Sequence, residues 1–167
     1  MEIRRAETAD LEQIMGIYQY AREFMRQTGN PGQWGENFPP RELIEEDIRV
    51  RQCYVCAEGE ETQGVFAFIL GEDPTYAVIE DGAWLNEEPY GTIHRIASAE
   101  GAKGVFAGCI TYCKGIIDNL RIDTHRDNKV MQHVIEKAGF QKCGIIHVAD
   151  GSERLAYQFS LENRTNV

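Results

Sequence analysis

Two glycines and a lysine lie between a predicted strand and a predicted helix, in the segment Gly101-Ala102-Lys103-Gly104. The apolar residues that follow recur near the spacing of one helix face, which predicts a helix from Val105 onwards. The first amides of a helix have no acceptor within it, so a turn that delivers them can hold an anion such as a phosphate. Because a Gly-x-x-Gly pair alone is common, the order of strand, turn and helix carries this prediction.

The strand before the turn carries His94, which could take a proton from a nearby reacting group. Alternation along residues 92–98 places His94 on the face of Ile96 and Ser98, with Arg95 on the other face. A histidine in a strand more often hydrogen-bonds within a core, and this alternative stays open.

A sheet and several helices must position these residues, and the hydrophobic pattern predicts both. Helical stripes cover residues 11–25 and 43–48, with Thr8 as the expected N-cap of the first, and a loop rich in Gly and Pro at 28–40 separates them. A later helix begins at Asn128. Strands are expected at residues 2–5, 54–57, 65–70, roughly 76–80, 92–98, 120–123, 142–148 and 154–160.

This mixture of elements indicates an α/β (α+β) fold with a mixed central sheet of six to seven strands, flanked by about four helices. The 167 residues are expected to form one domain at 1–160 and a tail at 161–167. No apolar run approaches the ~18 residues of a membrane span, and the first residues lack a basic-then-apolar leader pattern. We therefore expect a cytoplasmic protein with no membrane partner.

Acidic residues outnumber basic ones, and the formal net charge is −10. The excess lies in residues 1–94, which hold 19 Asp/Glu against 7 Lys/Arg, whereas residues 95–142 hold 8 Lys/Arg against 5 Asp/Glu. This balance disfavours a nucleic-acid partner, which requires a basic face, and suits a positively charged one. The acidic residues could equally serve only to solubilise the surface.

Five cysteines are predicted to be free and structural, because their number is odd and the chain looks intracellular. Cys53-Tyr54-Val55-Cys56 lies in a strand-like run, where residues three apart face opposite sides, so a redox pair is not expected. No second Cys or His pair completes a zinc set. We predict no metal site.

Residues 92–140 resemble the acetyl-CoA-binding core of the GNAT superfamily of N-acetyltransferases. That family has a strand end of the type hRiAv, a [Gln/Arg]-x-x-Gly-x-[Gly/Ala] loop and a helix with the pattern Asn-x-x-Ala-x-x-x-Tyr-x-x-x-Gly-Phe. Residues 94–98, 101–106 and 128–140 correspond to these parts, and residues 3–10 resemble the family's first strand and helix start. The resemblance covers nearly the whole chain. It implies a GNAT fold and acetyl transfer from acetyl-CoA to a primary amine, by direct attack on the thioester.

The resemblance assigns the end of the strand to the cofactor. The backbone of Ile96, Ala97 and Ser98 would pair with the pantetheine arm, and the Ala97 amide would polarise the thioester carbonyl. An ordinary central strand is the alternative. His94, directly or through water, would act as the base, because an amine must lose a proton before it attacks.

The resemblance also assigns the turn and the later helix. The expected pyrophosphate cradle consists of Ala102, Lys103, Gly104 and Val105. Asn128 would contact the pantetheine arm, cap its helix, or do both.

Four positions depart from the family pattern. Gly101 stands in place of Gln or Arg, and Phe106, in place of Gly or Ala, is expected to turn its ring into the core. Met131 replaces Ala, and Ile135 replaces the Tyr that often protonates the leaving thiolate. Tyr112, Tyr157 or solvent could supply the acid instead.

The acceptor would be the amine of a small molecule or a peptide, and Trp34 and Trp84 are candidates for its pocket or for packing. A homodimer is possible. The alternative function is a non-catalytic acyl-CoA-binding or sensory module with the same fold.

Overall fold

The computed structural model describes residues 1–161, so the predicted tail lies outside the described residues apart from Leu161. The elements in chain order are β1 (Glu2–Arg5), η1 (Thr8–Asp10), α1 (Leu11–Gln27), α2 (Arg41–Arg49), β2 (Cys53–Glu58), β3 (Glu61–Leu70), η2 (Pro74–Tyr76), β4 (Gly91–Ser98), α3 (Val105–Lys114), β5 (Asn119–Thr124), α4 (Lys129–Lys137), β6 (Gln141–His147) and β7 (Glu153–Ser160), where η marks a 3-10 helix.

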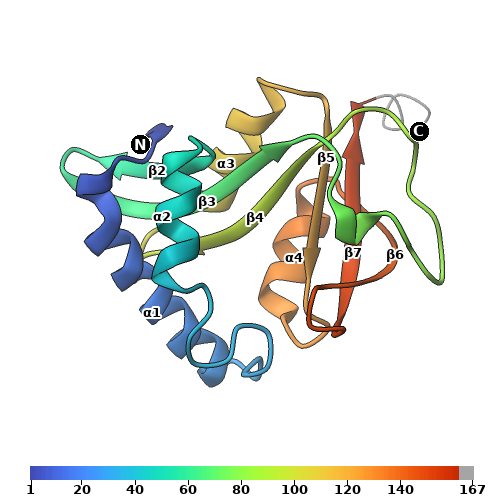
Figure 1. The fold of residues 1–167 in the computed structure, drawn as a ribbon, viewed down its shortest axis with the longest axis horizontal. Coiled ribbons are helices and arrows are strands. Elements are labelled where there is room, and N and C mark those ends of the chain that lie inside the picture. Colours follow the sequence, from blue (N-terminus) through green and yellow to red (C-terminus); the bar gives the residue numbers. More distant parts are fainter. Residues whose placement is uncertain (162–167) are drawn as a thin grey trace.

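One mixed sheet runs through the described part of the chain, with seven strands in the order β1-β2-β3-β4-β5-β7-β6 (Figure 1). All neighbours are antiparallel except β4 and β5, which are parallel. The crossover between these two strands is α3, as parallel strands require. The predicted fold class is confirmed.

The helices bury their apolar faces on opposite sides of the sheet. Helices α3 and α4 contribute Val105, Cys109 and Ile135 to one core, whereas α1 and α2 contribute Ile14 and Ile44 to the other. The two cysteines of the C-x-x-C run divide between these cores, Cys53 on the α1 side and Cys56 on the α3 side. This division agrees with the predicted alternation of the strand, and all five cysteines are free and buried.

Two local predictions are wrong. Residues 76–80 form no strand; Pro74–Tyr76 is a 3-10 helix, and Glu80 makes an isolated bridge to Ile145. The cause is visible in the sequence, since the Asp73 side chain accepts from the Thr75 amide and Pro74 stands at the first position of the turn. Thr8 is not an N-cap, because the first turn is a 3-10 helix capped by Glu7.

No helix within residues 1–161 has both the length and the apolar content needed to cross a membrane.

Candidate functional site

β4 and β5 pair only at their start, where Gly91 and Thr92 face Leu120 and Arg121. Beyond these residues the two strands diverge (Figure 1), while β4 stays paired with β3 to its end. In the described part of the chain, residues 93–98 thus have no strand partner on the β5 side. An extended ligand can add to such an edge as if it were another strand.

A bulge interrupts β4 within this edge. Arg95 and Ile96 together lie opposite Phe66 of β3, and Arg95 has a φ of 53°, in the left-handed region. The extra residue reverses the alternation, so Ile96 packs on the same core as Ile93 while His94 lies on the other face. The prediction that His94 and Ile96 share a face is wrong, because the period-two rule assumes an unbroken strand.

The pairing of β4 with β3 determines which amides face the open edge. The Ala99 amide donates to the Gln63 carbonyl at 2.8 Å. Hydrogen-bonded and non-bonded positions alternate in an antiparallel pair, so the Ala97 amide also faces β3. The amides of Ile96 and Ser98 face the side of β5. They are the donors that this edge offers to a ligand.

The turn before α3 leaves five consecutive amides free. The first helical hydrogen bond is donated by Gly108 to the carbonyl of Gly104, at 2.9 Å, and Gly104 has a φ of 80°. No acceptor within residues 1–161 receives a hydrogen bond from the amides of residues 103–107. The Ala102 amide instead closes the turn on the Ala99 carbonyl at 3.1 Å. The N-terminus of α3 is therefore able to bind an anion.

Close packing holds the start of α3 against β3. A Cβ on Gly64 would lie 2.5 Å from Cγ1 of Val105, so only glycine allows this approach. Phe106 turns its ring toward the core below α3, as predicted, and leaves the exposed side to Lys103 and Gly104.

Asn128 begins α4 on the other side of the divergence. Its Oδ1 accepts from the Met131 amide at 3.0 Å, which confirms the capping role, and its Nδ2 donates to Oε1 of Gln33 at 2.9 Å. The backbone carbonyl of Gln33 accepts from Arg154 of β7 at 3.2 Å. The loop at 28–40 therefore reaches from α1 across to α4 and β7.

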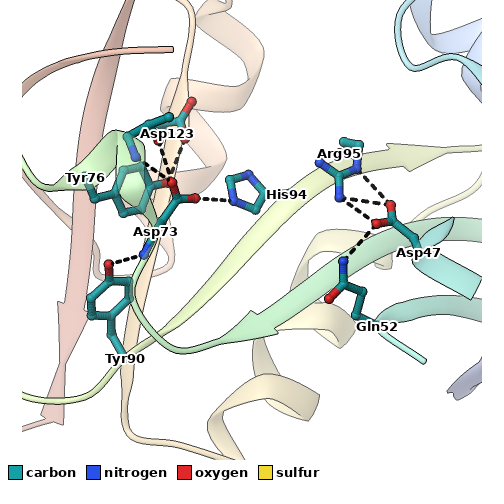
Figure 2. Close-up of polar contacts among 9 residues, drawn as sticks. Asp47, Gln52, Asp73, Tyr76, Tyr90, His94, Arg95 and Asp123 are labelled. Atoms are coloured by element: carbon teal, nitrogen blue, oxygen red, sulfur yellow. Dashed lines mark hydrogen bonds and ion pairs between the residues drawn. The ribbon is translucent and has the colours of Figure 1, made fainter. Parts of the chain in front are cut away.

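His94 is oriented by a carboxylate. Its Nε2 lies 2.8 Å from Oδ2 of Asp73 (Figure 2). Oδ1 of Asp73 accepts from both the amide and the hydroxyl of Thr75. Burial raises the pKa of Asp73, but the hydrogen bonds from His94 and Thr75 outweigh it and hold the pKa at about 2. An ionised Asp73 accepts the Nε2 proton, so the lone pair of neutral His94 is on Nδ1.

A second carboxylate lies beside this pair. The Tyr76 hydroxyl donates to Oδ2 of Asp123 at 2.6 Å, and the Tyr76 and His94 rings are 6.3 Å apart (Figure 2). Burial raises the pKa of Asp123, while His94 and Tyr76 oppose that rise. Asp73, Tyr76 and Asp123 were not predicted as site residues. The Asp73-Pro74 pair marks a turn in the sequence, but only tertiary packing brings that turn beside β4.

Solved structures that are similar to this chain include acetyltransferases. The crystal structure of a GNAT-family acetyltransferase from Streptococcus agalactiae 2603 is 33% identical, covers 95% of this chain and 94% of its own, and has a TM-score of 0.85. The chain belongs to the GNAT family. A putative acetyltransferase from Staphylococcus aureus Mu50 is similar at 25% identity, with coverages of 96% and 99% and a TM-score of 0.71. No protein-family model and no curated protein matches the chain.

A more distant neighbour shares only the fold. It is a putative acetyltransferase from Salmonella typhimurium, whose structure was solved with its cofactor acetyl-CoA; it is 15% identical, with coverages of 96% and 93% and a TM-score of 0.62. The residues 1–161 of this GNAT chain contain no cluster of His, Cys, Asp and Glu that could hold a metal ion.

The two tryptophans of this GNAT chain lie in different places. Trp34, in the loop at 28–40, packs edge-on against Tyr18, with the ring centroids 5.6 Å apart. Trp84 donates to the Tyr76 carbonyl at 2.9 Å, and the Arg121 guanidinium lies 4.0 Å from its ring. Both rings therefore have packing partners, and their role in an acceptor pocket stays a prediction.

The position where the family pattern has a tyrosine is filled by Ile135, which has no exposed surface. Tyr157 is buried, its hydroxyl donates to Glu136 at 3.2 Å, and burial raises its pKa to about 12. Tyr112 lies over β2, where its ring contacts Tyr54. Within residues 1–161, neither tyrosine makes a hydrogen bond or a ring contact with a residue of β4.

Proposed function

We propose that this GNAT-family chain transfers the acetyl group of acetyl-CoA to the primary amine of a small molecule or peptide. One observation carries the proposal. The open edge of β4 runs through the turn at 99–104 directly into the free amides of α3. Donors on the strand edge followed by donors at the helix N-terminus suit a ligand with an amide-bearing arm and a pyrophosphate.

The residues around the turn fit the anionic part of that ligand. The free amides of residues 103–107 lie together at the N-terminus of α3, where they can bind a phosphate. The exposed Lys103 adds a positive charge, in the part of the sequence that has an excess of basic residues. In this proposal the Ile96 and Ser98 amides bind the arm. The Ile96 amide, rather than that of Ala97, polarises the thioester carbonyl, because the Ala97 amide faces β3.

His94 acts as the base. Its Nδ1 takes a proton from the acceptor amine, directly or through water, and Asp73 stabilises the imidazolium that results. The amine nitrogen forms a bond to the acyl carbon, and the carbon–sulfur bond breaks. Acetyl-CoA supplies the activated acyl group. The thiolate leaves and takes a proton from solvent, since Ile135 replaces the usual tyrosine and a thiolate is a good leaving group.

Release of free thiol in the presence of a panel of amines tests this function. Polyamines, amino acids, peptides and aminoglycosides each serve as acceptor, and product mass identifies the acetylated one. The His94→Gln variant is expected to lower kcat by about 10²-fold, with little change in the affinity for acetyl-CoA. His147→Gln, at an exposed end of β6, is the matched control.

One observation favours a second function. Ile135 is fully buried, so the tyrosine of the family pattern has no counterpart there. A non-catalytic acyl-CoA-binding or sensory module would bind acetyl-CoA by calorimetry and release no thiol with any amine. Absence of binding by folded protein would refute both functions.

A further inference from the structure

Arg95 is an unusual residue for the place that it occupies. The left-handed position of a bulge is ordinarily filled by glycine, because a side chain there meets the backbone. Arg95 adopts a φ of 53° at this position, and its side chain is only 13% exposed. Its surroundings must hold it in that conformation.

Two helices hold Arg95, α2 through its side chain and α1 through its backbone carbonyl. Its guanidinium donates through Nε and Nη2 to the two carboxylate oxygens of Asp47 in α2, each at 3.0 Å (Figure 2). Its backbone carbonyl accepts from the hydroxyl of Tyr18 in α1 at 2.6 Å. Asp47 and Tyr18 are each 1% exposed, and Gln52 donates a further hydrogen bond to Asp47 at 3.0 Å.

The peptide bond that Tyr18 fixes also carries the Ile96 amide. A carbonyl and the amide of the next residue belong to one rigid plane, so the direction of the Arg95 carbonyl sets that of the Ile96 N–H. The carbonyl is held by Tyr18 of α1, so the Ile96 N–H points away from α1, and the pairing of β4 with β3 leaves this N–H on the unpaired side of the strand.

We propose that Asp47, Arg95 and Tyr18 form a lock that aims the Ile96 amide at the thioester carbonyl. These three are positioning residues, because each of them acts through the direction of the Ile96 amide rather than by contact with the acyl group. The inference rests on the proposed acetyl transfer. It predicts that the lock acts on the chemical step, where charge develops on the carbonyl oxygen, and leaves the binding of the pyrophosphate unchanged.

Three substitutions test the lock. Asp47→Asn keeps the shape of the side chain and weakens its two hydrogen bonds with the Arg95 guanidinium. Arg95→Gly permits the same φ without any ion pair. Tyr18→Phe removes the hydrogen bond to the Arg95 carbonyl. Each is expected to lower kcat by about 10-fold or more, because an oxyanion donor is worth about 10²–10³. The Kd for coenzyme A by calorimetry should stay within about 3-fold.

The Arg4–Asp10 pair provides the control. It is also bidentate, with distances of 2.8 and 2.9 Å, and it joins β1 to η1 away from β4. Asp10→Asn should lower the midpoint of urea unfolding without changing kcat. Equal kcat losses in Asp10→Asn and Asp47→Asn would show a merely structural role and overturn the lock.

A second readout does not depend on turnover or on the Arg95→Gly variant folding. The Ile96 amide resonance of the wild-type chain should shift differently with acetyl-CoA than with coenzyme A, and this difference should shrink in Tyr18→Phe. An Ile96 amide that responds equally to both ligands refutes the lock alone. Failure of the folded wild-type chain to bind either ligand refutes the proposed function and the lock together.

Discussion

The Asp73→Asn substitution tests the orientation of His94 through both stability and activity. Asp73 has a pKa of about 2, against an ordinary value of 3.8. A pKa lowered by nearly two units corresponds to about 2 kcal/mol of folding free energy. Because the pKa is lower in the folded protein, this stabilisation is complete above about pH 5 and is lost as the pH falls through 3.8 toward 2.

Urea unfolding at several pH values measures this contribution. Asp73→Asn should be less stable than the wild-type chain by about 2 kcal/mol at pH 7 and by about 1 kcal/mol at pH 3. Asp81→Asn makes the same change at an exposed carboxylate and should leave stability at pH 7 nearly unchanged. A deficit of equal size at both pH values would contradict the ionised Asp73, since the lost energy would then have another source.

The same variant should lose activity through the tautomer of His94. The Asp73 oxygen that accepts from Thr75 would remain an amide oxygen, so the new NH2 group would face Nε2 of His94. Nε2 must then accept, and the proton moves to Nδ1, where the base is needed. We expect kcat to fall by about 10²-fold. If the folded variant has an unchanged kcat, His94 is not the base of the reaction.

Two further predictions concern the start of α3. Lys103→Glu should weaken acetyl-CoA binding by about 10-fold in low salt, measured by calorimetry. Lys142→Glu on β6 makes the same charge change and should have little effect. Equal losses of affinity in the two variants would show that net charge, rather than the free amides before α3, controls binding. Gly64→Ala places a Cβ 2.5 Å from Val105 and should destabilise the chain by about 1–3 kcal/mol in urea unfolding. Val105→Ala in the same chain should recover part of that loss, and strictly additive losses would exclude the steric contact as the cause.

The positions of most strands and helices could be predicted from the sequence because they follow from periodicity. The turn at Gly101–Gly104 and the helix after it were predicted from spacing, and the free amides there are what that order of elements requires. The cap at Asn128 followed from its residue type. Such features depend on neighbours within a few residues.

The bulge in β4 could not be predicted in the same way. Glycine would have marked a left-handed position, but Arg95 holds it through contacts with α1 and α2, which are distant in the sequence. The face of His94 and the direction of the Ala97 amide both change at this bulge. Asp73 and Tyr76 reach His94 through a connection whose path depends on tertiary packing, so no spacing rule could have joined them.

The contacts of Gln33 have a mechanical consequence for the sheet. Two residue pairs join β4 to β5 at one end of their divergence, and Gln33 ties the opposite end together through Asn128 and Arg154. The part of the sheet with β1–β4 and the part with β5–β7 are thus joined at one end by the β4–β5 strand pairing and at the other end by side-chain hydrogen bonds. Moving the two strands further apart would break the hydrogen bonds of Gln33 and also the contact that Tyr76 makes between Asp123 of β5 and His94 of β4, while the ladder at Gly91 and Thr92 could stay intact.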